Sequence, residues 1–170
     1  KLWNANNFLI TNECDFKDID DLPNLNVNIN KWIYSELIET KNKIQKNLED
    51  YRFDEAAKNA YQFAWHSYCD WYLELSKTIL FSDDNDAKAE VKKVSSYVFK
   101  QILILLHPFI PFVTEEIWLK DQFDKNGSDY LMHKNWVTGE VNKDNSTEQV
   151  ENIINIISEL RSFKNELNVS

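Results

Sequence analysis

Glycine is almost absent from this chain. Only Gly127 and Gly139 occur among 170 residues. Hairpin turns and β-bulges rely on glycine because they place residues at positive φ, so the sequence argues against a many-stranded β-sandwich or barrel. The clustered glycines of Rossmann and P-loop nucleotide sites are missing as well. With 43% hydrophobic and 14% aromatic residues, the chain has enough apolar material for one helical core without disulfides or metals.

The apolar residues recur at helical spacing through most of the chain. Two stripes are especially regular: one runs from Ile29 to Leu48, and the other from Val91 to Leu105 in steps of three and four. A third stripe comprises Ala57, Ala60, Ala64, Trp71 and Leu75. The spacing predicts an all-α bundle with helices over 1–12, 29–49, 53–81, 87–107 and 111–123 and from residue 146 onward. An acidic loop over 13–26 and turns at 50–52 and 82–86 join them.

The predicted helix ends carry residues that favour such positions. Pro108 disfavours helical geometry at His107 and ends the fourth helix there. Asn28 or Asn30 is the predicted N-cap of the second helix. Pro111 is expected at the first position of the fifth helix, with Glu115 and Glu116 in its first turn. Ser146 and Gln149 form a predicted capping box at the start of the terminal helix.

These patterns divide the chain into three parts. Residues 1–123 form the predicted helical bundle, residues 124–145 an irregular strap that holds both glycines, and residues 146–170 a terminal helix. The apolar residues of the terminal helix are Val150, Ile153, Ile154, Ile157, Leu160 and Leu167. Because the chain starts at Lys1 without a methionine and stops within a helical pattern, we expect it to be a piece of a longer protein.

The charge balance is acidic. Lys and Arg number 19 against 28 Asp and Glu, a net charge of −9, and only Arg52 and Arg161 are arginines. Proteins that bind nucleic acid tightly on their own usually carry the opposite sign, because contacts to phosphates supply much of their affinity. If this chain binds RNA, another part of the protein must hold most of the RNA.

The sequence offers little for catalysis, metal binding or membrane insertion. Cys14 and Cys69 stand 55 positions apart, and the three histidines are scattered, so neither a zinc site nor a disulfide framework is expected. Free thiols favour a reducing, cytoplasmic location. The longest uncharged stretch, residues 101–114, is too short to span a membrane and is predicted to be core.

Amide side chains surround two aromatic residues near the N-terminus. Trp3 and Phe8 occur among Asn4, Asn6, Asn7 and Asn12. Most of the other aromatic residues fall on apolar stripes and are expected in the core. Amides hydrogen-bond base edges and aromatic rings stack on bases, so the first helix is the best candidate for a surface that reads RNA bases.

Four segments resemble the valyl-tRNA synthetases, which are class Ia synthetases. They are KLWNA at 1–5, CDWYLE at 69–74, LHPFIPFVTEEIW at 106–118 and NELNVS at 165–170. The resemblance implies an α-helical anticodon-binding domain, with the last helix leading toward the C-terminal region of the parent enzyme. The parent would use ATP to ligate valine to tRNA(Val). Its nucleotide-binding motifs HIGH and KMSKS are absent here, so this fragment is expected to hold no catalytic residue, cofactor or metal.

The resemblance also suggests where the anticodon is contacted. The family pattern KLWNAxRF has an anticodon-facing arginine where this chain has Asn7, and the family's DRW becomes residues 30–32, with Lys31 in place of arginine. The predicted anticodon-binding residues are Trp3, Asn4, Asn7, Phe8 and Lys31. Valine anticodons have adenine in the middle, and the donor and acceptor of an asparagine amide match N6 and N7 of adenine. We therefore predict that Asn7 reads this base.

Two other functions remain open at this point. The chain could be the corresponding domain of an isoleucyl-tRNA synthetase, or a structural helical bundle that docks proteins and has no RNA role. The valyl-tRNA synthetase interpretation predicts a cytoplasmic monomer that does not bind a membrane. Its partners would be the anticodon region of tRNA(Val) and the rest of its own protein.

Overall fold

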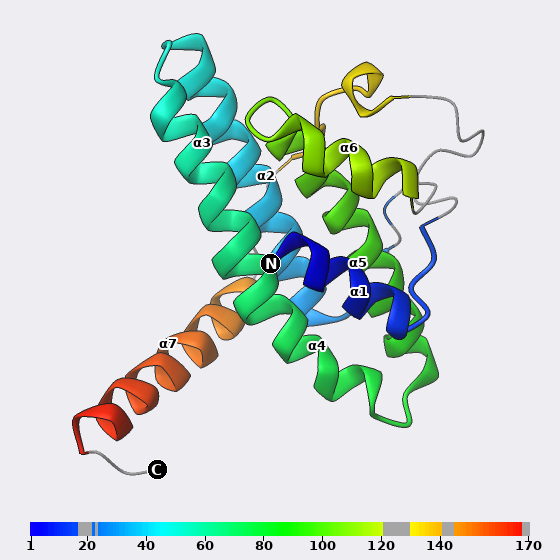
Figure 1. The fold of residues 1–170 in the computed structure, drawn as a ribbon. Coiled ribbons are helices and arrows are strands. Elements are labelled where there is room, and N and C mark those ends of the chain that lie inside the picture. The colour runs from blue at the N-terminus through cyan, green and yellow to red at the C-terminus, as the bar shows by residue number, and fades with distance from the viewer. Residues whose placement is uncertain (17–21, 23, 121–129, 141–144, 168–170) are drawn as a thin grey trace.

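The computed structural model describes residues 1–16, 22, 24–120, 130–140 and 145–167 (Figure 1), except for the side chain of Asn165. All regular structure in these residues is helical, which confirms the all-α prediction. In chain order the elements are α1 (Leu2–Thr11), α2 (Asn28–Glu49), α3 (Phe53–Gln62), the π-helix η1 (Phe63–Tyr72), α4 (Leu73–Leu80), α5 (Asn85–Leu106), α6 (Pro111–Lys120), the 3₁₀-helix η2 (Leu131–His133) and α7 (Asn145–Glu166).

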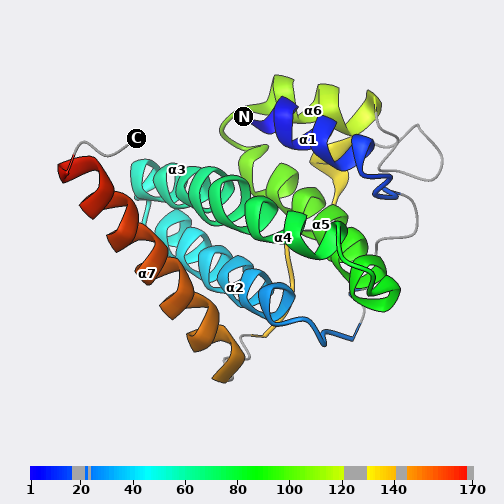
Figure 2. The same cartoon turned by 90° about the horizontal axis from the view of Figure 1, so that it is seen from below.

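The helices pack in layers. α3, η1 and α4 follow one another without a break and form a long rod, which packs against both α2 and α5. α1 and α6 both pack on α5, and α7 lies along α2 (Figure 2). The rod and α5 therefore lie between α1 and α2 in Figure 2. None of the described helices is long and apolar enough to cross a membrane.

Helix α5 forms the centre of the core. Every residue from Val94 to Leu106 is buried. A helix buried on all sides needs apolar residues around its whole circumference, and the run of Ile and Leu from Ile102 to Leu106 supplies them. Of the uncharged stretch 101–114 that was predicted to be core, residues 101–106 and Thr114 are buried, whereas residues 107–113 are half-buried or exposed, and Phe112 is 91% exposed.

The predicted helix over 53–81 is present as the rod, but its buried face differs from the prediction. Ala57, Trp71 and Leu75 are only half-buried. Burial instead recurs at every fourth residue, at Ala56, Ala60, Ala64, Tyr68, Tyr72 and Ser76. An α-helix has 3.6 residues per turn, so a four-residue spacing would gradually rotate away from the core. The wider π-helical turns of η1, which carry Tyr68 and Tyr72, take up the extra residues and keep this line buried.

Neither Asn28 nor Asn30 caps α2, contrary to the prediction. The N-cap is Val27, whose side chain cannot cap, and Asn30 is fully buried within the first turn. The carboxylate of Glu90 on α5 accepts hydrogen bonds from the backbone N–H groups of Asn26 and Val27 at 3.0 Å and from Nδ2 of Asn30 at 2.8 Å. A residue distant in sequence thus fixes the start of this helix.

The predicted start of α6 at Pro111 is confirmed, and α7 starts one residue before the predicted position, but the residues expected at these two helix starts are wrong. Glu115 and Glu116 lie beyond the first turn of α6. The Glu115 carboxylate instead accepts a hydrogen bond from the backbone N–H of Leu131 at 3.1 Å, which ties η2 to α6. α7 begins at Asn145, so Ser146 lies inside the helix rather than at its N-cap. The predicted end of the fifth helix at Phe123 lies outside the described residues.

The described part of the strap contacts α2 through Gly139. This glycine has φ +145°. A Cβ atom at this position would lie 2.5 Å from Oη of Tyr34 and 2.7 Å from Cδ1 of Ile38. Both the backbone angle and the close approach therefore require glycine at residue 139. Gly127 lies outside the described residues.

Helix α7 packs on the bundle through one side only. Val150 is buried, and Ile154 and Ile157 are half-buried. The guanidinium of Arg161 lies 5.0 Å from the centre of the Trp71 ring and extends this contact to η1. The other apolar residues of the predicted stripe, Ile153, Leu160 and Leu167, are exposed.

Candidate nucleic-acid interface

Helix α1 separates its side chains into three directions. Leu2, Ala5, Asn6 and Leu9 are buried, and the helix packs on α5. Trp3 and Asn7 are four residues apart, so they lie one turn apart on an exposed face. Asn4 and Phe8, also one turn apart, line a groove between α1 and the rod. The four candidate residues of α1 thus form two pairs on adjacent faces.

Only two of the four amides on the first helix face solvent freely. Asn6 is fully buried. Nδ2 of Asn12 donates to the carbonyl of Phe8 at 2.8 Å and closes the C-terminal turn of α1. The side chains of Asn4 and Asn7 are exposed and make no hydrogen bond within the described part of the chain. They keep both a donor and an acceptor for another molecule.

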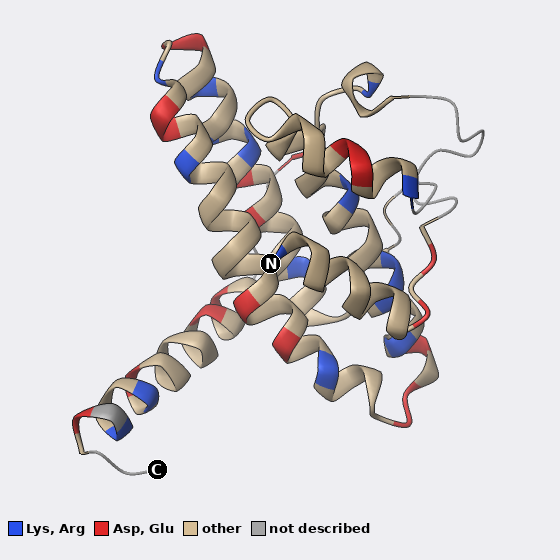
Figure 3. Cartoon of the chain, viewed as in Figure 1, with Lys and Arg blue, Asp and Glu red and all other residues tan. Residues whose placement is uncertain are grey.

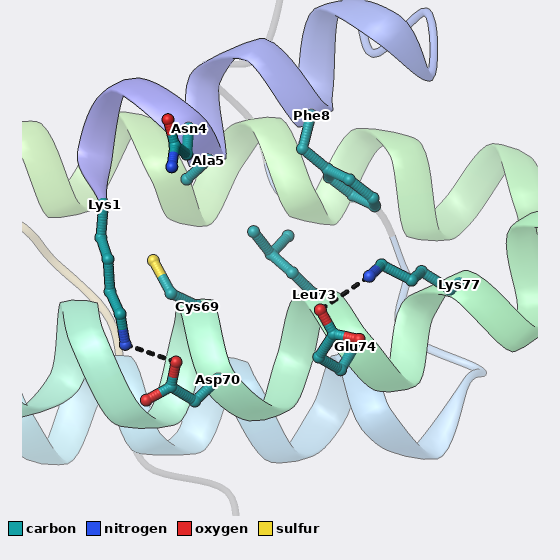
Figure 4. Close-up of a pocket in the computed structure, with 9 residues that line it drawn as sticks. All are labelled: Lys1, Asn4, Ala5, Phe8, Cys69, Asp70, Leu73, Glu74 and Lys77. Carbon is teal, nitrogen blue, oxygen red and sulfur yellow. Dashed lines mark hydrogen bonds and ion pairs between the residues drawn. The ribbon is translucent and has the colours of Figure 1, made fainter.

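The groove next to Asn4 has an apolar floor and a charged rim (Figure 4). Its volume is about 250 Å³, and Ala5, Phe8, Cys69 and Leu73 contribute its apolar surface. Figure 4 shows the Phe8 ring directed from α1 toward the rod. An apolar floor beside a free amide can accept a flat aromatic group such as a nucleobase.

Two ion pairs form the rim of the groove. Nζ of Lys1 lies 2.5 Å from Asp70, and Nζ of Lys77 lies 2.7 Å from Glu74. The hydrogen bond to Asp70 raises the pKa of Lys1, so this lysine stays charged. Lys77 also lies 5.8 Å from the centre of the Phe8 ring. Each lysine of the rim already has a carboxylate partner, which limits its attraction for phosphate.

The thiol in the groove is poorly suited to nucleophilic chemistry. Burial raises the pKa of Cys69 to about 11, so the sulfur is a neutral thiol at physiological pH. Within the described residues, no three His, Cys, Asp or Glu side chains gather in a way that could hold a metal ion.

The structure does not bring Lys31 together with the α1 residues. Lys31 is half-buried in the first turn of α2. α1 and α2 lie on opposite sides of the layer formed by the rod and α5 (Figure 2). A single RNA loop bound at Trp3 and Asn7 would have to reach around this layer to contact Lys31.

One cation next to Trp3 was missing from the sequence-based site. Nζ of Lys120, the last residue of α6, lies 4.6 Å from the centre of the Trp3 ring. The two residues are 117 positions apart, and no periodicity or motif in the sequence connects them. Figure 3 shows acidic and basic residues interspersed along the helices in this view, rather than a continuous basic strip.

Residues 30–170 match a protein family described as the anticodon-binding domain of tRNA ligase. The whole chain is 76% identical over 170 residues to a valine–tRNA ligase of Pelagibacter ubique. It is 36% identical to the enzyme of Mesorhizobium japonicum and 39% identical to that of Caulobacter vibrioides, with 99% of the chain covered in each case. The chain spans 18% to 19% of the length of these three relatives. The alignments to these relatives include α1, which precedes the family match.

Proposed function

The chain belongs to the family of tRNA-ligase anticodon-binding domains, and from this we propose that it recognises the anticodon of tRNA(Val) as part of a valine–tRNA ligase. The observation that carries the proposal is the solvent face of α1. It offers two free amides: Asn7 lies one turn from the exposed Trp3 side chain, and Asn4 lies one turn from the half-buried Phe8 ring in the neighbouring groove. This combination suits bases that are splayed out of a single-stranded loop.

The proposal assigns recognition to this chain and chemistry to the rest of the protein. Activation of valine with ATP and its transfer to tRNA would take place in a catalytic region outside these 170 residues. The acidic net charge of −9 fits this division. A domain tethered to a region that grips the tRNA works at high effective concentration, so a weak local site is sufficient. We include in the proposal a monomer in the cytoplasm, where the two free cysteines would stay reduced.

Within the site, Asn7 is proposed to read the middle adenine of the anticodon. Its amide can donate to N7 and accept from the N6 amino group of adenine in a bidentate contact. Trp3, one turn away on the same face, would supply the stacking wall. Asn4 and Phe8 face the neighbouring groove and would contact an adjacent nucleotide.

Binding to anticodon stem-loop RNA tests the proposal. We expect the chain to bind a stem-loop with a valine anticodon weakly, and to bind one with guanine at the middle position more weakly still. A fluorescence anisotropy titration at low salt measures both affinities. Equal affinity for the two RNAs, or for an unrelated hairpin, would favour the structural docking bundle and contradict anticodon recognition. Charging assays with valine and isoleucine on the full-length protein separate the two synthetase alternatives.

A further inference from the structure

Trp3 and Lys120 bridge the first and sixth helices on the exposed face that carries Asn7. The ammonium of Lys120 lies 4.6 Å from the centre of the Trp3 ring. Trp3 is 38% exposed, so it can hold the ammonium and still offer surface to another group. Both α1 and α6 pack on the buried helix α5, which fixes the two residues relative to each other. The cation therefore stands over the Trp3 ring, and Asn7 lies one helical turn further along the same face of α1.

Lys120 differs from Lys1 and Lys77 because it has no carboxylate partner among the described residues. Lys1 is paired with Asp70, and Lys77 is paired with Glu74. Lys120 makes no ion pair or hydrogen bond within the described part of the chain, and the Trp3 ring is its only partner there. A cation held over an aromatic ring keeps its full charge and its hydrogen-bond donors on the open side.

We propose that Lys120 binds a backbone phosphate of the RNA loop whose base is read by Asn7. This step rests on the proposed anticodon function and adds the contact that positions the strand. A base contact gives sequence preference, whereas a phosphate contact sets the register of the strand on the protein. A lysine can bind phosphate as a point charge without the planar fork of arginine. Lys120 thus supplies, from another helix, the positive charge that Asn7 does not carry.

The dependence of binding on salt distinguishes the two contacts. Each phosphate contact to single-stranded nucleic acid contributes about −0.7 to the slope of log K against log salt concentration. We expect Lys120→Gln to make the slope shallower by about this amount while the preference for the middle adenine persists. Asn7→Ala should remove that preference and leave the slope unchanged. The chain and a valine-anticodon stem-loop, titrated at four or more salt concentrations, give both quantities.

Matched variants control for charge and fold. Lys58→Gln on α3 changes the net charge equally, but Lys58 is paired with Glu55 at 3.7 Å, and the slope should stay as in the wild type. Trp3→Leu should weaken binding and make the slope shallower. Trp3→Phe keeps a ring under the ammonium, so it should retain most of the affinity and of the slope. Circular dichroism confirms that each variant is folded.

The outcomes separate this inference from the proposed function. If Lys120→Gln keeps the wild-type slope, or if Lys58→Gln lowers the slope equally, the phosphate contact is wrong even though anticodon preference persists. If the wild-type chain shows no preference for the valine anticodon, the proposed function itself fails. A shallower slope for Lys120→Gln but not for Lys58→Gln, with the preference retained, supports both.

Discussion

The hydroxyl of Tyr72 donates a hydrogen bond to Oδ1 of Asn30 at 2.8 Å, and neither side chain is accessible to solvent. The same hydroxyl accepts a bond from Oγ of Ser95 at 3.3 Å. Nδ2 of Asn30 in turn donates to Glu90. This chain of bonds joins η1, α2 and α5 in the interior, where an unsatisfied polar atom is costly.

We expect Tyr72→Phe to destabilise the fold by about 1 to 3 kcal/mol, because it leaves the Asn30 carbonyl oxygen without its donor. Burial raises the pKa of Tyr72, so the hydroxyl remains a donor throughout the pH range in which the protein folds. Urea denaturation measures the loss. Tyr51→Phe is the control, since Tyr51 is 82% exposed and should change stability little. An equal effect of the two variants would contradict the role of the buried bond.

Gly139→Ala should destabilise the protein by about 2 to 4 kcal/mol, since strain at positive φ adds to overpacking. The new methyl group would meet the Tyr34 hydroxyl and Ile38. Thermal unfolding gives the loss. In the background of Tyr34→Phe, which removes the hydroxyl, Gly139→Ala should cost less but still be unfavourable because of the backbone angle. A neutral Gly139→Ala variant would show that the strap does not approach α2 in this way.

Glu36 makes stability depend on pH. Burial raises its pKa, and the hydrogen bond from Oγ of Ser67 offsets this only in part. The folded state therefore binds the Glu36 proton more tightly than the unfolded state does, so stability is highest below the unfolded pKa and falls as pH rises through the folded pKa. We expect Glu36→Gln to be more stable than the wild type at pH 7, with the advantage shrinking as pH falls toward 4.

Denaturation curves at several pH values test this expectation. Glu49→Gln provides the same change in net charge at an exposed position of the same helix. If the two variants show the same pH dependence, the effect comes from net charge and not from the burial of Glu36.

Asn7→Ala in the full-length protein should weaken charging of tRNA(Val) by roughly 1 to 3 kcal/mol in kcat/KM, the range for one bidentate base contact. Discrimination against a tRNA with a substituted middle base should shrink in parallel. Aminoacylation kinetics with both tRNAs provide the measurement. A variant that charges both tRNAs as the wild type does would show that Asn7 is only a solvent-exposed helix residue.

The long helices could be predicted from the sequence because their apolar residues keep a regular spacing. The predicted ranges 29–49 and 87–107 differ from α2 and α5 by no more than two residues at either end. The residues that cap the helices and fill their first turns were harder to predict. The start of α2 depends on Glu90, and Glu115 binds the backbone of Leu131, so distant partners replace the local caps that a sequence pattern can indicate.

The candidate site was only partly predictable for the same reason. The amide and aromatic residues of α1 are adjacent in sequence, and the helical spacing alone places Trp3 with Asn7 and Asn4 with Phe8. Lys31 is predicted only by resemblance to a family motif, and it lies on α2, which the rod and α5 separate from α1. Lys120 is brought to Trp3 only by the packing of two helices on α5, which spacing within one segment cannot indicate.

The line of buried residues at every fourth position makes the rod sensitive to insertions and deletions. Tyr68 donates a hydrogen bond to the Ser95 carbonyl on α5, and Tyr72 donates one to Asn30 on α2. The contacts of the rod with both helices therefore depend on the same residue register. Loss of one residue between Ala56 and Ser76 would rotate every later side chain by about 100° and move these hydroxyls away from their acceptors. Related chains should therefore vary in side chains here while keeping the same number of residues, and alignment gaps should fall in the connecting loops.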